Sequence, residues 1–592
     1  MSLRTRVSSL CIAMLTLSMG CVMRSTEPVV LIGKEGNINH IRISDTSNAV
    51  VRFAAAELQH YIRQITGINL PINNNESAKA ISLELADDKA IKWDGYRIRT
   101  TEAGLQLTGH EPRALLYAVY DLLEQSGCSF FYPGVQEQIV PVKKYIEWRI
   151  KDSLFTPLLK HRGLAPYGLD AKGLEEGRNF IDWMAKNRLN YILVSENRPS
   201  DSDGPANGSV WKEVREELLP ELQKRGFVIE MSEHCMPVFF PRSLFVTHPE
   251  WFALNGGKRK IGPPPYSGQM CYSNKDAVEY YGDALAKYAV VHPEFKTIGT
   301  WPLDGGDYCE CEQCKNPYTV FNAVLSIAKK IRKVRPDIIV EHLAYKEQTW
   351  QPPPIDSIPS NISVLWCRDA GESGELVKQW KQKLDPAAGI YQFEYYLGDN
   401  YRSRTNLWLR PIYASQMVEQ AIATGYRGVI SLTLPIQNWW RSSFNNRFYA
   451  RASWQPQFNP DSELEKYYKA YYGGQAIEAK NIFTKIWQEL QHEPYSRESS
   501  AIASNWQRIE KQAPGIIQLI DSVMSQSTDT VIHERFNRIK TYVEFQVLHT
   551  KAYYTREKSD LENLAKYSRD HPEQSMVLMY PGYIIWRNEE YF

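Results

Sequence analysis

The sequence lacks an excess of either charge and has no basic tract. Its 592 residues include 69 Lys and Arg against 68 Asp and Glu, which gives a formal net charge of +1. Proteins that bind a nucleic-acid backbone neutralise many phosphates and show a basic stripe or a strongly basic domain. We therefore predict no nucleic-acid partner. A chain balanced in this way fits an uncharged ligand better than a polyanion.

The amino-terminal region lacks a hydrophobic run long enough for a membrane span. The apolar stretch Leu10–Met19 is shorter than the about 20 helical residues that a bilayer requires. It follows a basic start and ends at Gly20-Cys21, so residues 1–20 are predicted to be a lipoprotein-type signal peptide with Cys21 as the lipidated residue. An ordinary secretory signal is the alternative. Both kinds of signal predict export. The lipoprotein-type signal also predicts a lipid anchor, in the periplasm or at the outer membrane, as the only membrane contact.

Several catalytic fingerprints are also missing. The chain has no Gly-x-Ser-x-Gly, no His-Glu-x-x-His and no glycine-rich phosphate or dinucleotide loop. These absences disfavour serine hydrolases of the nucleophile-elbow type, zinc proteases of the zincin type and nucleotide-dependent enzymes. Aromatic residues, in contrast, are plentiful: 16 Trp, 35 Tyr and 20 Phe. Flat aromatic faces suit sugar rings, although large cores use them too.

Hydrophobic periodicity divides the chain into three folded units. Residues 28–152 mix short strands with helices predicted at Asn48–Thr66 and Arg113–Gln125, which indicates a small α+β domain. In residues 155–456, eight β-rich runs alternate with amphipathic helices, the pattern of an α/β protein with a (β/α)8 TIM barrel. Residues 457–592 are predicted to form a helical domain. The predicted barrel strands are Leu158–Leu164, Tyr191–Val194, Phe227–Met231, Thr297–Leu303, Ile338–Leu343, Ile362–Trp366, Gly389–Tyr395 and Gly428–Leu434.

Carboxylates lie where a TIM barrel places its chemistry, at the carboxyl ends of the strands and in the loops after them. Asp304 follows the fourth predicted strand and Glu394 lies on the seventh, so we predict these two as a catalytic pair. Glycoside hydrolysis needs such a pair, one group to protonate the leaving oxygen and one at the anomeric centre. Glu233, after the third strand, competes for this role. A capped Asp-Gly-Gly turn is the alternative interpretation of Asp304.

Other polar and aromatic side chains near the strand ends are predicted to bind the substrate. Arg162 would hold sugar hydroxyls from the barrel floor, or would pair with a buried carboxylate. A structural role is the alternative for both predicted histidines. Trp366, inside a strand, is expected in the core, whereas Trp440 is expected to be exposed. The residues predicted to bind substrate are Arg162, Glu233, His234, Trp301, His342, Tyr345, Tyr396 and Trp439.

Three cysteines are clustered as Cys309-x-Cys311-x-x-Cys314, and Cys271 on the preceding loop is the candidate for a fourth member. Thiols of exported proteins tend to oxidise, but a disulfide between such close neighbours is strained. We therefore predict either a structural zinc site or disulfides. Four thiolates would leave no open position for a hydrolytic water, so no catalytic role is expected for this cluster. No cofactor is predicted for catalysis.

Blocks of the predicted barrel resemble glycoside hydrolase family 163, formerly a domain of unknown function. They are His248–Leu254, Cys271–Asn274, Asp304-Gly305 with the cysteine string, and Ala344-Tyr345. Other stretches are similar to the non-catalytic amino-terminal domain that glycoside hydrolase families 20 and 67 share. They are Ala54–Leu58, Ile65–Gly67 and Ala114–Glu124.

The resemblance implies an endo-β-N-acetylglucosaminidase acting on N-glycans, of the type found in gut Bacteroidota. The predicted barrel entry, His161-Arg162-Gly163, resembles that of families 20 and 67, which implies that Arg162 binds the sugar in the reactive subsite. The sequence departs from the family at Leu303, where Asn is frequent, and at Glu394, where Asp is common. We expect an exported glycoside hydrolase that acts on a glycan. An exo-acting α-glucuronidase-like enzyme and a non-catalytic glycan-binding lipoprotein are the alternatives.

Overall fold

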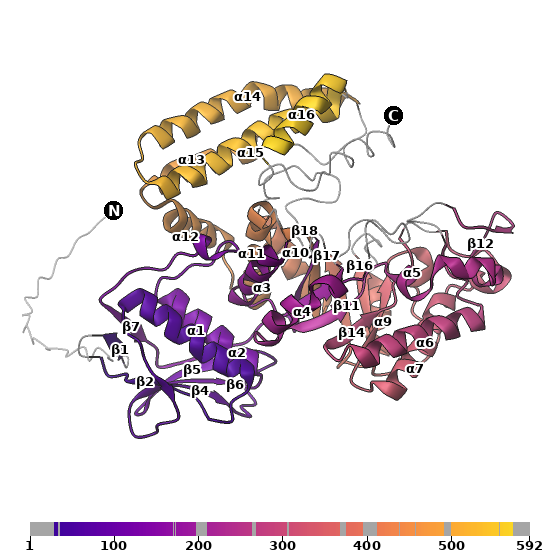
Figure 1. The fold of residues 1–592 in the computed structure, drawn as a ribbon, viewed down its shortest axis with the longest axis horizontal. Coiled ribbons are helices and arrows are strands. Elements are labelled where there is room, and N and C mark those ends of the chain that lie inside the picture. Colours follow the sequence, from indigo (N-terminus) through magenta and orange to yellow (C-terminus); the bar gives the residue numbers. More distant parts are fainter. Residues whose placement is uncertain are drawn as a thin grey trace, which may run out of the picture.

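The computed structural model of the chain contains three units, which Figure 1 shows as an α/β domain, a barrel and a helical arm. No helix among the described residues is long and apolar enough to cross a membrane. The described residues are 29–33, 36–167, 169, 171, 173–196, 210–262, 268–304, 307–367, 374–394, 411–436, 439–455, 457–490, 499–555 and 557–571.

The amino-terminal domain packs two helices against one six-stranded sheet, and Figure 1 shows both helices over the same face. Helix α1 (Ala49–Thr66) begins after Asn48, whose side chain accepts the N–H of Val50, and ends at Gly67 in the left-handed conformation. Helix α2 is Pro112–Gln125. The sheet has the order β3-β2-β4-β6-β5-β8, and a separate antiparallel pair joins β1 to β7. These strands are β1 Val29–Gly33, β2 His40–Arg42, β3 Ile72–Asn73, β4 Ala80–Leu85, β5 Tyr96–Thr101, β6 Gly104–Gly109, β7 Tyr145–Arg149 and β8 Asp152–Phe155.

The central unit is a closed barrel of eight parallel strands in the order β10-β11-β14-β15-β16-β17-β18-β9. This confirms the predicted (β/α)8 TIM barrel. The barrel strands are β9 His161–Tyr167, β10 Tyr191–Val194, β11 Val228–Met231, β14 Phe295–Gly299, β15 Ile339–Ala344, β16 Ile362–Cys367, β17 Ile390–Glu394 and β18 Gly428–Pro435. The helices of this unit are α3 Leu174–Lys186, α4 Trp211–Gln223, α5 Met236–Phe239, α6 Lys275–Val291, α7 Thr319–Val334, α8 Glu347–Trp350, α9 Gly374–Lys383, α10 Pro411–Thr424 and α11 Trp439–Trp454.

Side chains alternate strictly between the inside of the barrel and the layer between strands and helices. On β15, Leu343 belongs to the small cluster inside the barrel, whereas Val340 and Ala344 belong to the outer core. On β17, Phe393 lies inside and Ile390 outside. This alternation decides which strand residues can face a substrate.

The carboxy-terminal unit is helical in its described part, as predicted, and forms the arm that is coloured orange to yellow in Figure 1. It packs on the barrel through α11. The ring of Phe444 lies 4.5 Å from that of Tyr467, and Trp440 lies 6.2 Å from Tyr542, measured between centroids. Trp440 is buried, which corrects the expectation that it is exposed, because its helix faces the arm. The arm contains α12 Pro460–Tyr472, α13 Ala476–Lys485, α14 Ser499–Ser525, α15 Thr530–Thr555 and α16 Lys558–Asp570.

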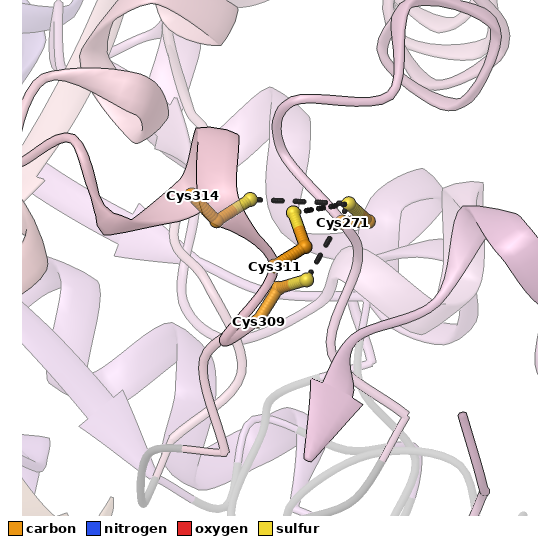
Figure 2. Close-up of side chains that lie close together, drawn as sticks. All are labelled: Cys271, Cys309, Cys311 and Cys314. Carbon is orange, nitrogen blue, oxygen red and sulfur yellow. Dashed lines mark hydrogen bonds between the residues drawn. The ribbon is translucent and has the colours of Figure 1, made fainter. Parts of the chain in front are cut away.

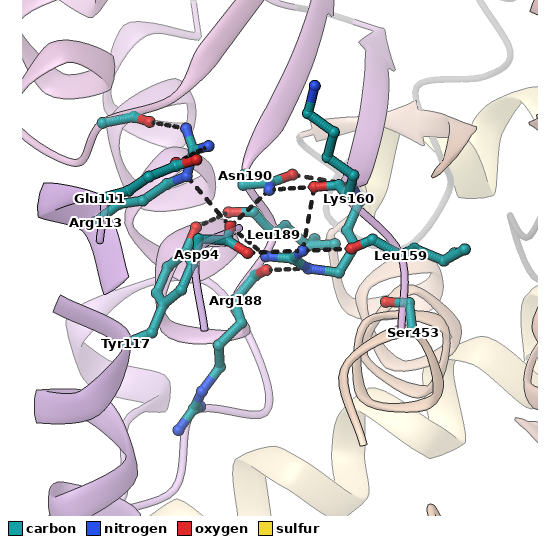
Figure 3. A network of polar contacts seen from close by, with 12 residues as sticks. Asp94, Glu111, Arg113, Tyr117, Leu159, Lys160, Arg188, Leu189, Asn190 and Ser453 are labelled. Carbon is teal, nitrogen blue, oxygen red and sulfur yellow. Dashed lines mark hydrogen bonds and ion pairs between the residues drawn. The ribbon is translucent and has the colours of Figure 1, made fainter. Parts of the chain in front are cut away.

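A buried ion-pair network attaches the amino-terminal domain to the barrel (Figure 3). Arg162 Nη2 donates to Asp94 Oδ2 at 2.7 Å, and Nη1 donates to Oδ1 at 3.2 Å. Asn190 Nδ2 and Arg113 Nε donate to the same carboxylate at 2.7 and 3.2 Å. Because β9 begins at His161, Arg162 lies at the amino end of its strand. The catalytic side of a TIM barrel is at the opposite, carboxyl ends of the strands.

This placement corrects the prediction that Arg162 binds sugar. Arg162 and Asp94 are both fully buried, and the guanidinium also donates to the backbone carbonyls of Leu159 and Arg188. The structure therefore shows the other alternative, in which the arginine pairs with a buried carboxylate. The physical reason is the strand boundary, since β9 extends to Tyr167 rather than ending near Gly163.

Candidate active site

Glu233 lies just beyond the carboxyl end of β11 in an unusual conformation. Its φ of 73° is in the left-handed region, which is uncommon for a residue with a side chain and is often found at functional sites. It is only 8% exposed. Burial, and then the charge of Asp304, raise the pKa of Glu233 to about 8. This carboxyl group therefore keeps its proton at neutral pH.

Asp304 lies in the loop that follows β14, the barrel strand that pairs with β11. Its side chain is 31% exposed, so solvent or a substrate can reach it. His234 Nε2 lies 3.9 Å from Asp304 Oδ1, and the Nδ1 of the same ring is 2.5 Å from the carbonyl oxygen of Pro302. A carbonyl only accepts, so Nδ1 carries the proton. Burial lowers the pKa of His234, against the opposing effect of Asp304, and keeps the ring neutral.

Aromatic rings and a lysine complete the site. The rings of Trp301 and Tyr345 lie 5.2 and 6.3 Å from that of His234. Lys346 Nζ lies 4.1 Å from the centre of the Tyr345 ring, within cation–π range. Lys346 was not among the predicted residues, and the observed end of β15 two residues before it is what places it at the site. The site thus combines a protonated carboxyl, an accessible carboxylate, a neutral histidine, two aromatic rings and a cation.

A second carboxyl pair lies inside the barrel below this site, and sequence reasoning missed it. Glu230 of β11 and Glu341 of β15 are fully buried and hydrogen-bonded to each other. Tyr191 donates its hydroxyl to Glu230 at 2.6 Å, and Trp301 Nε1 donates to Glu341 at 2.9 Å. Burial raises the pKa of both groups, so the pair holds a proton between its carboxyls. It also fixes the indole at the floor of the site.

Two other predicted residues face away from the site because of strand alternation. His342 neighbours the inward-facing Glu341 and lies in the outer layer, where its Nε2 is 2.9 Å from the carbonyl oxygen of Thr349. Glu394 follows Phe393, whose ring lies inside the barrel 5.4 Å from that of Trp301. Glu394 is therefore on the outer face, where it is buried and contributes to raising the pKa of Tyr426 in the outer core. Both placements correct the predicted roles.

Three predictions fall outside the described residues. They concern Tyr396, the side chain of Trp439 and the lipidation site Cys21. The backbone of Trp439 begins α11. Trp366 is buried in the outer core, as expected for a residue inside a strand.

The four predicted cysteines come together (Figure 2), and three of them lie on the loop that carries Asp304. Cys271 Sγ lies 3.5 Å from Cys309 Sγ and 3.8 Å from both Cys311 Sγ and Cys314 Sγ. These separations are well beyond the about 2.05 Å of a disulfide bond. None of the described cysteines forms a disulfide bond. The cluster is therefore arranged as a set of four thiols.

Comparisons with known proteins give a family and a shared fold. The family described as "Domain of unknown function (DUF4838)" matches residues 132–484, and "Glycosyl hydrolase family 20, domain 2" matches residues 36–126. The second match agrees with the predicted resemblance of the amino-terminal domain to that of family 20. No curated protein matches the sequence.

Solved structures of glycoside hydrolases share the fold at low identity. A GH115 4-O-methyl-α-glucuronidase, BtGH115A, with specificity for decorated arabinogalactans, has a TM-score of 0.63 at 11% identity over 92% of this chain and 77% of that one. A GH138 enzyme targeting pectin rhamnogalacturonan II has a TM-score of 0.52 at 12% identity over 90% of both chains. The chitobiase FjGH20 from Flavobacterium johnsoniae has a TM-score of 0.50 at 12% identity over 92% of this chain and 95% of that one. The architecture is thus one that glycoside hydrolases use, and the chain, matched over more than half its length, belongs to the DUF4838 family.

Proposed function

We propose that the protein is an exported glycoside hydrolase that cleaves a glycosidic bond in a complex glycan, with Glu233 and Asp304 as its catalytic carboxyls. The observation that carries this proposal is the pairing of a protonated with an accessible carboxyl at adjacent strand ends of a TIM barrel. Glu233 replaces Glu394 in this role because Glu394 faces the outer layer.

The chemistry follows from the different environments of the two groups. Glu233 holds its proton at neutral pH and donates it to the oxygen of the leaving sugar. Asp304 supports the positive charge that develops at the anomeric centre, or orients an acetamido group of the substrate that does so. The unprotonated Nε2 of His234 accepts a hydrogen bond from a sugar hydroxyl. The rings of Trp301 and Tyr345 pack against the apolar face of the sugar. No step of this scheme uses a cofactor.

An N-acetylglucosamine linkage, cleaved in the endo mode, is our first substrate. It is supported by the resemblance to family 163 and by the family 20 domain at residues 36–126. Lys346 favours a second candidate, a uronate removed in the exo mode, because an ammonium group against the Tyr345 ring of the site suits a sugar carboxylate. The name of BtGH115A, an α-glucuronidase, supports this second candidate as well.

The test is hydrolysis of N-glycans and of uronate-containing oligosaccharides by the wild type, Glu233→Gln and Asp304→Asn. Asp307→Asn is a matched control, since Asp307 is exposed on the same loop and Asn tolerates its positive φ of 49°. We expect both site variants to lose activity and the control to keep it. Release of whole glycans indicates endo cleavage, and release of single sugars indicates exo cleavage. Binding without turnover by the wild type would instead support a glycan-binding lipoprotein.

Export and lipidation form a separate part of the proposal. Cys21 would carry the lipid, so Cys21→Ser is expected to move the protein from the membrane fraction to the soluble periplasmic fraction. Unchanged membrane association of this variant would contradict lipidation at Cys21.

A further inference from the structure

We propose that Cys271, Cys309, Cys311 and Cys314 bind one zinc ion, and that this ion fixes the loop that carries Asp304. The first part is independent of the proposed function, and the second rests on it. The ion would be structural, because four protein ligands leave no position for a reacting water.

The separations between the sulfur atoms fit zinc. A tetrahedral site with Zn–S bonds of about 2.3 Å has sulfur atoms about 3.8 Å apart. The three separations from Cys271 Sγ are 3.5, 3.8 and 3.8 Å, and all four sulfur atoms lie within 4.8 Å of one another. Disulfide pairing would bring one sulfur much closer to Cys271 than the other two, and no such preference exists.

The surroundings of the cluster also suit bound thiolates. The backbone N–H of Leu254 donates to Cys309 Sγ at 3.2 Å. The Arg259 guanidinium, on the short strand β13 (Lys258–Arg259), hydrogen-bonds to Cys271. Four thiolates and one Zn²⁺ carry a net charge of −2, which an adjacent cation and N–H donors offset.

The cluster connects two segments that are distant in sequence, and one of them carries Asp304. Cys271 belongs to the segment 252–271, whereas the other three cysteines follow Asp304 in the same loop. Two residues before Cys271, Gln269 accepts the N–H of Leu303 at 3.3 Å and donates to its carbonyl at 3.4 Å. Glu310 N donates to the carbonyl of Leu254 at 2.8 Å. Asp304 therefore lies between two places where its loop is joined to the cysteine-bearing segment.

The first experiment is the zinc content of the purified full-length protein, with Cys311→Ser as the site variant and Cys128→Ala as a control far from the cluster. We expect about one zinc per chain in the wild type and in the control, and at least a fivefold loss in Cys311→Ser. Cobalt substitution of the wild type should give the absorption of a tetrahedral cobalt–thiolate site. Substoichiometric zinc without cobalt absorption, or mass-spectrometric evidence of disulfides among the four cysteines, would overturn the site.

The second experiment tests the link to Asp304 without relying on a variant that might fail to fold. Zinc is removed from the wild type with a chelator, and retention of the folded state is checked by circular dichroism. We expect kcat to fall at least tenfold, with a smaller change in KM, and to recover when zinc is restored. Zinc loss with unchanged kcat would overturn the positioning role. If Asp304→Asn is fully active, the proposed function fails while the zinc content remains an independent result.

Discussion

The charge of Asp304 adds to burial in holding a proton on Glu233. The two residues follow adjacent barrel strands, β11 and β14, and their environments differ, since Glu233 is buried and Asp304 is partly open to solvent. Environments that separate the protonation states of two nearby carboxyls assign one as the acid and leave the other ionised. The left-handed backbone of Glu233 points to the same site, because strained residues collect where function requires them.

Activity should depend on the protonation of Glu233. We expect kcat/KM to fall as pH rises through about 8, the pKa of this acid. In Asp304→Asn, the alkaline decrease of the residual activity should occur at a lower pH than in the wild type. The reason is that the charge of Asp304, one of the two causes of the raised pKa of Glu233, is gone. A pH–rate profile of both proteins checks this, and an alkaline limb at the same pH in both would contradict it.

The same group links stability to pH. The pKa of Glu233 rises from 4.5 to about 8 on folding, so between these values the folded protein holds a proton that the unfolded chain has lost. This contribution to stability is complete below pH 4.5 and decreases as pH rises toward about 8. Glu233→Gln removes it and should therefore be more stable, relative to the wild type, near pH 8 than near pH 5. Urea unfolding of the variant and of the wild type at both pH values measures the difference, and an equal difference at the two pH values would contradict this linkage.

The ion pair between Arg162 and Asp94 should matter for folding rather than for sugar binding. Asp94→Asn leaves Arg162 buried without a counter-charge, which should cost about 3–5 kcal/mol of stability. Because neither residue reaches the site, the folded fraction of the variant should keep the wild-type KM. Chemical denaturation and steady-state kinetics test the two parts. A large rise in KM with unchanged stability would restore the sugar-binding role for Arg162.

Lys346 should discriminate between the two candidate substrates. A hydrogen bond to a charged group contributes about 1.5–3 kcal/mol, so Lys346→Met should lower kcat/KM for a uronate substrate at least tenfold. An N-acetylglucosamine substrate carries no carboxylate and should lose less than threefold. Lys315→Met, at an exposed lysine, is the matched control. Equal losses on both substrates would remove Lys346 as the basis for a uronate preference.

The inner carboxyl pair should hold Trp301 in place. Glu341→Gln keeps an acceptor for the indole N–H and a donor for Glu230, so it should keep most activity. Glu341→Ala removes the acceptor and leaves a cavity, and should lower both kcat and stability. Because burial raises the pKa of the pair, its favourable contribution is largest at low pH and decreases as pH rises. Kinetics and urea unfolding of both variants test these expectations.

Much of the fold could be predicted because buried parallel strands are short apolar runs that alternate with amphipathic helices and polar loops. The observed β10 is the predicted Tyr191–Val194, and the observed α7 is the predicted Thr319–Val334. The site was harder to predict because both faces of a barrel strand are buried, so apolar alternation does not mark the inner face. His342 and Glu394 were misplaced for this reason. The prediction for Arg162 was wrong because the observed strand β9 continues to Tyr167, beyond the predicted end at Leu164.

The pairing of Glu233 with Asp304 could not be read from spacing, since it depends on how two loops approach each other beyond neighbouring strands. The cysteine cluster was easier, because three of its four members are close in sequence. The sequence alone does not identify Lys346 or the pair of Glu230 and Glu341 as site residues. The strand bounds and the inner faces of the strands have to be known first.

Acid catalysis by Glu233 is tested most directly by the rates at which Glu233→Gln cleaves two kinds of substrate. One is the natural glycan that the wild type cleaves, and the other is an aryl glycoside of the same sugar whose leaving group needs no proton. General acid catalysis contributes about 10²–10⁴-fold, so the variant should lose at least a hundredfold on the glycan. It should lose little on the aryl glycoside. Cleavage of the natural glycan by Glu233→Gln at the wild-type rate would contradict acid catalysis by Glu233.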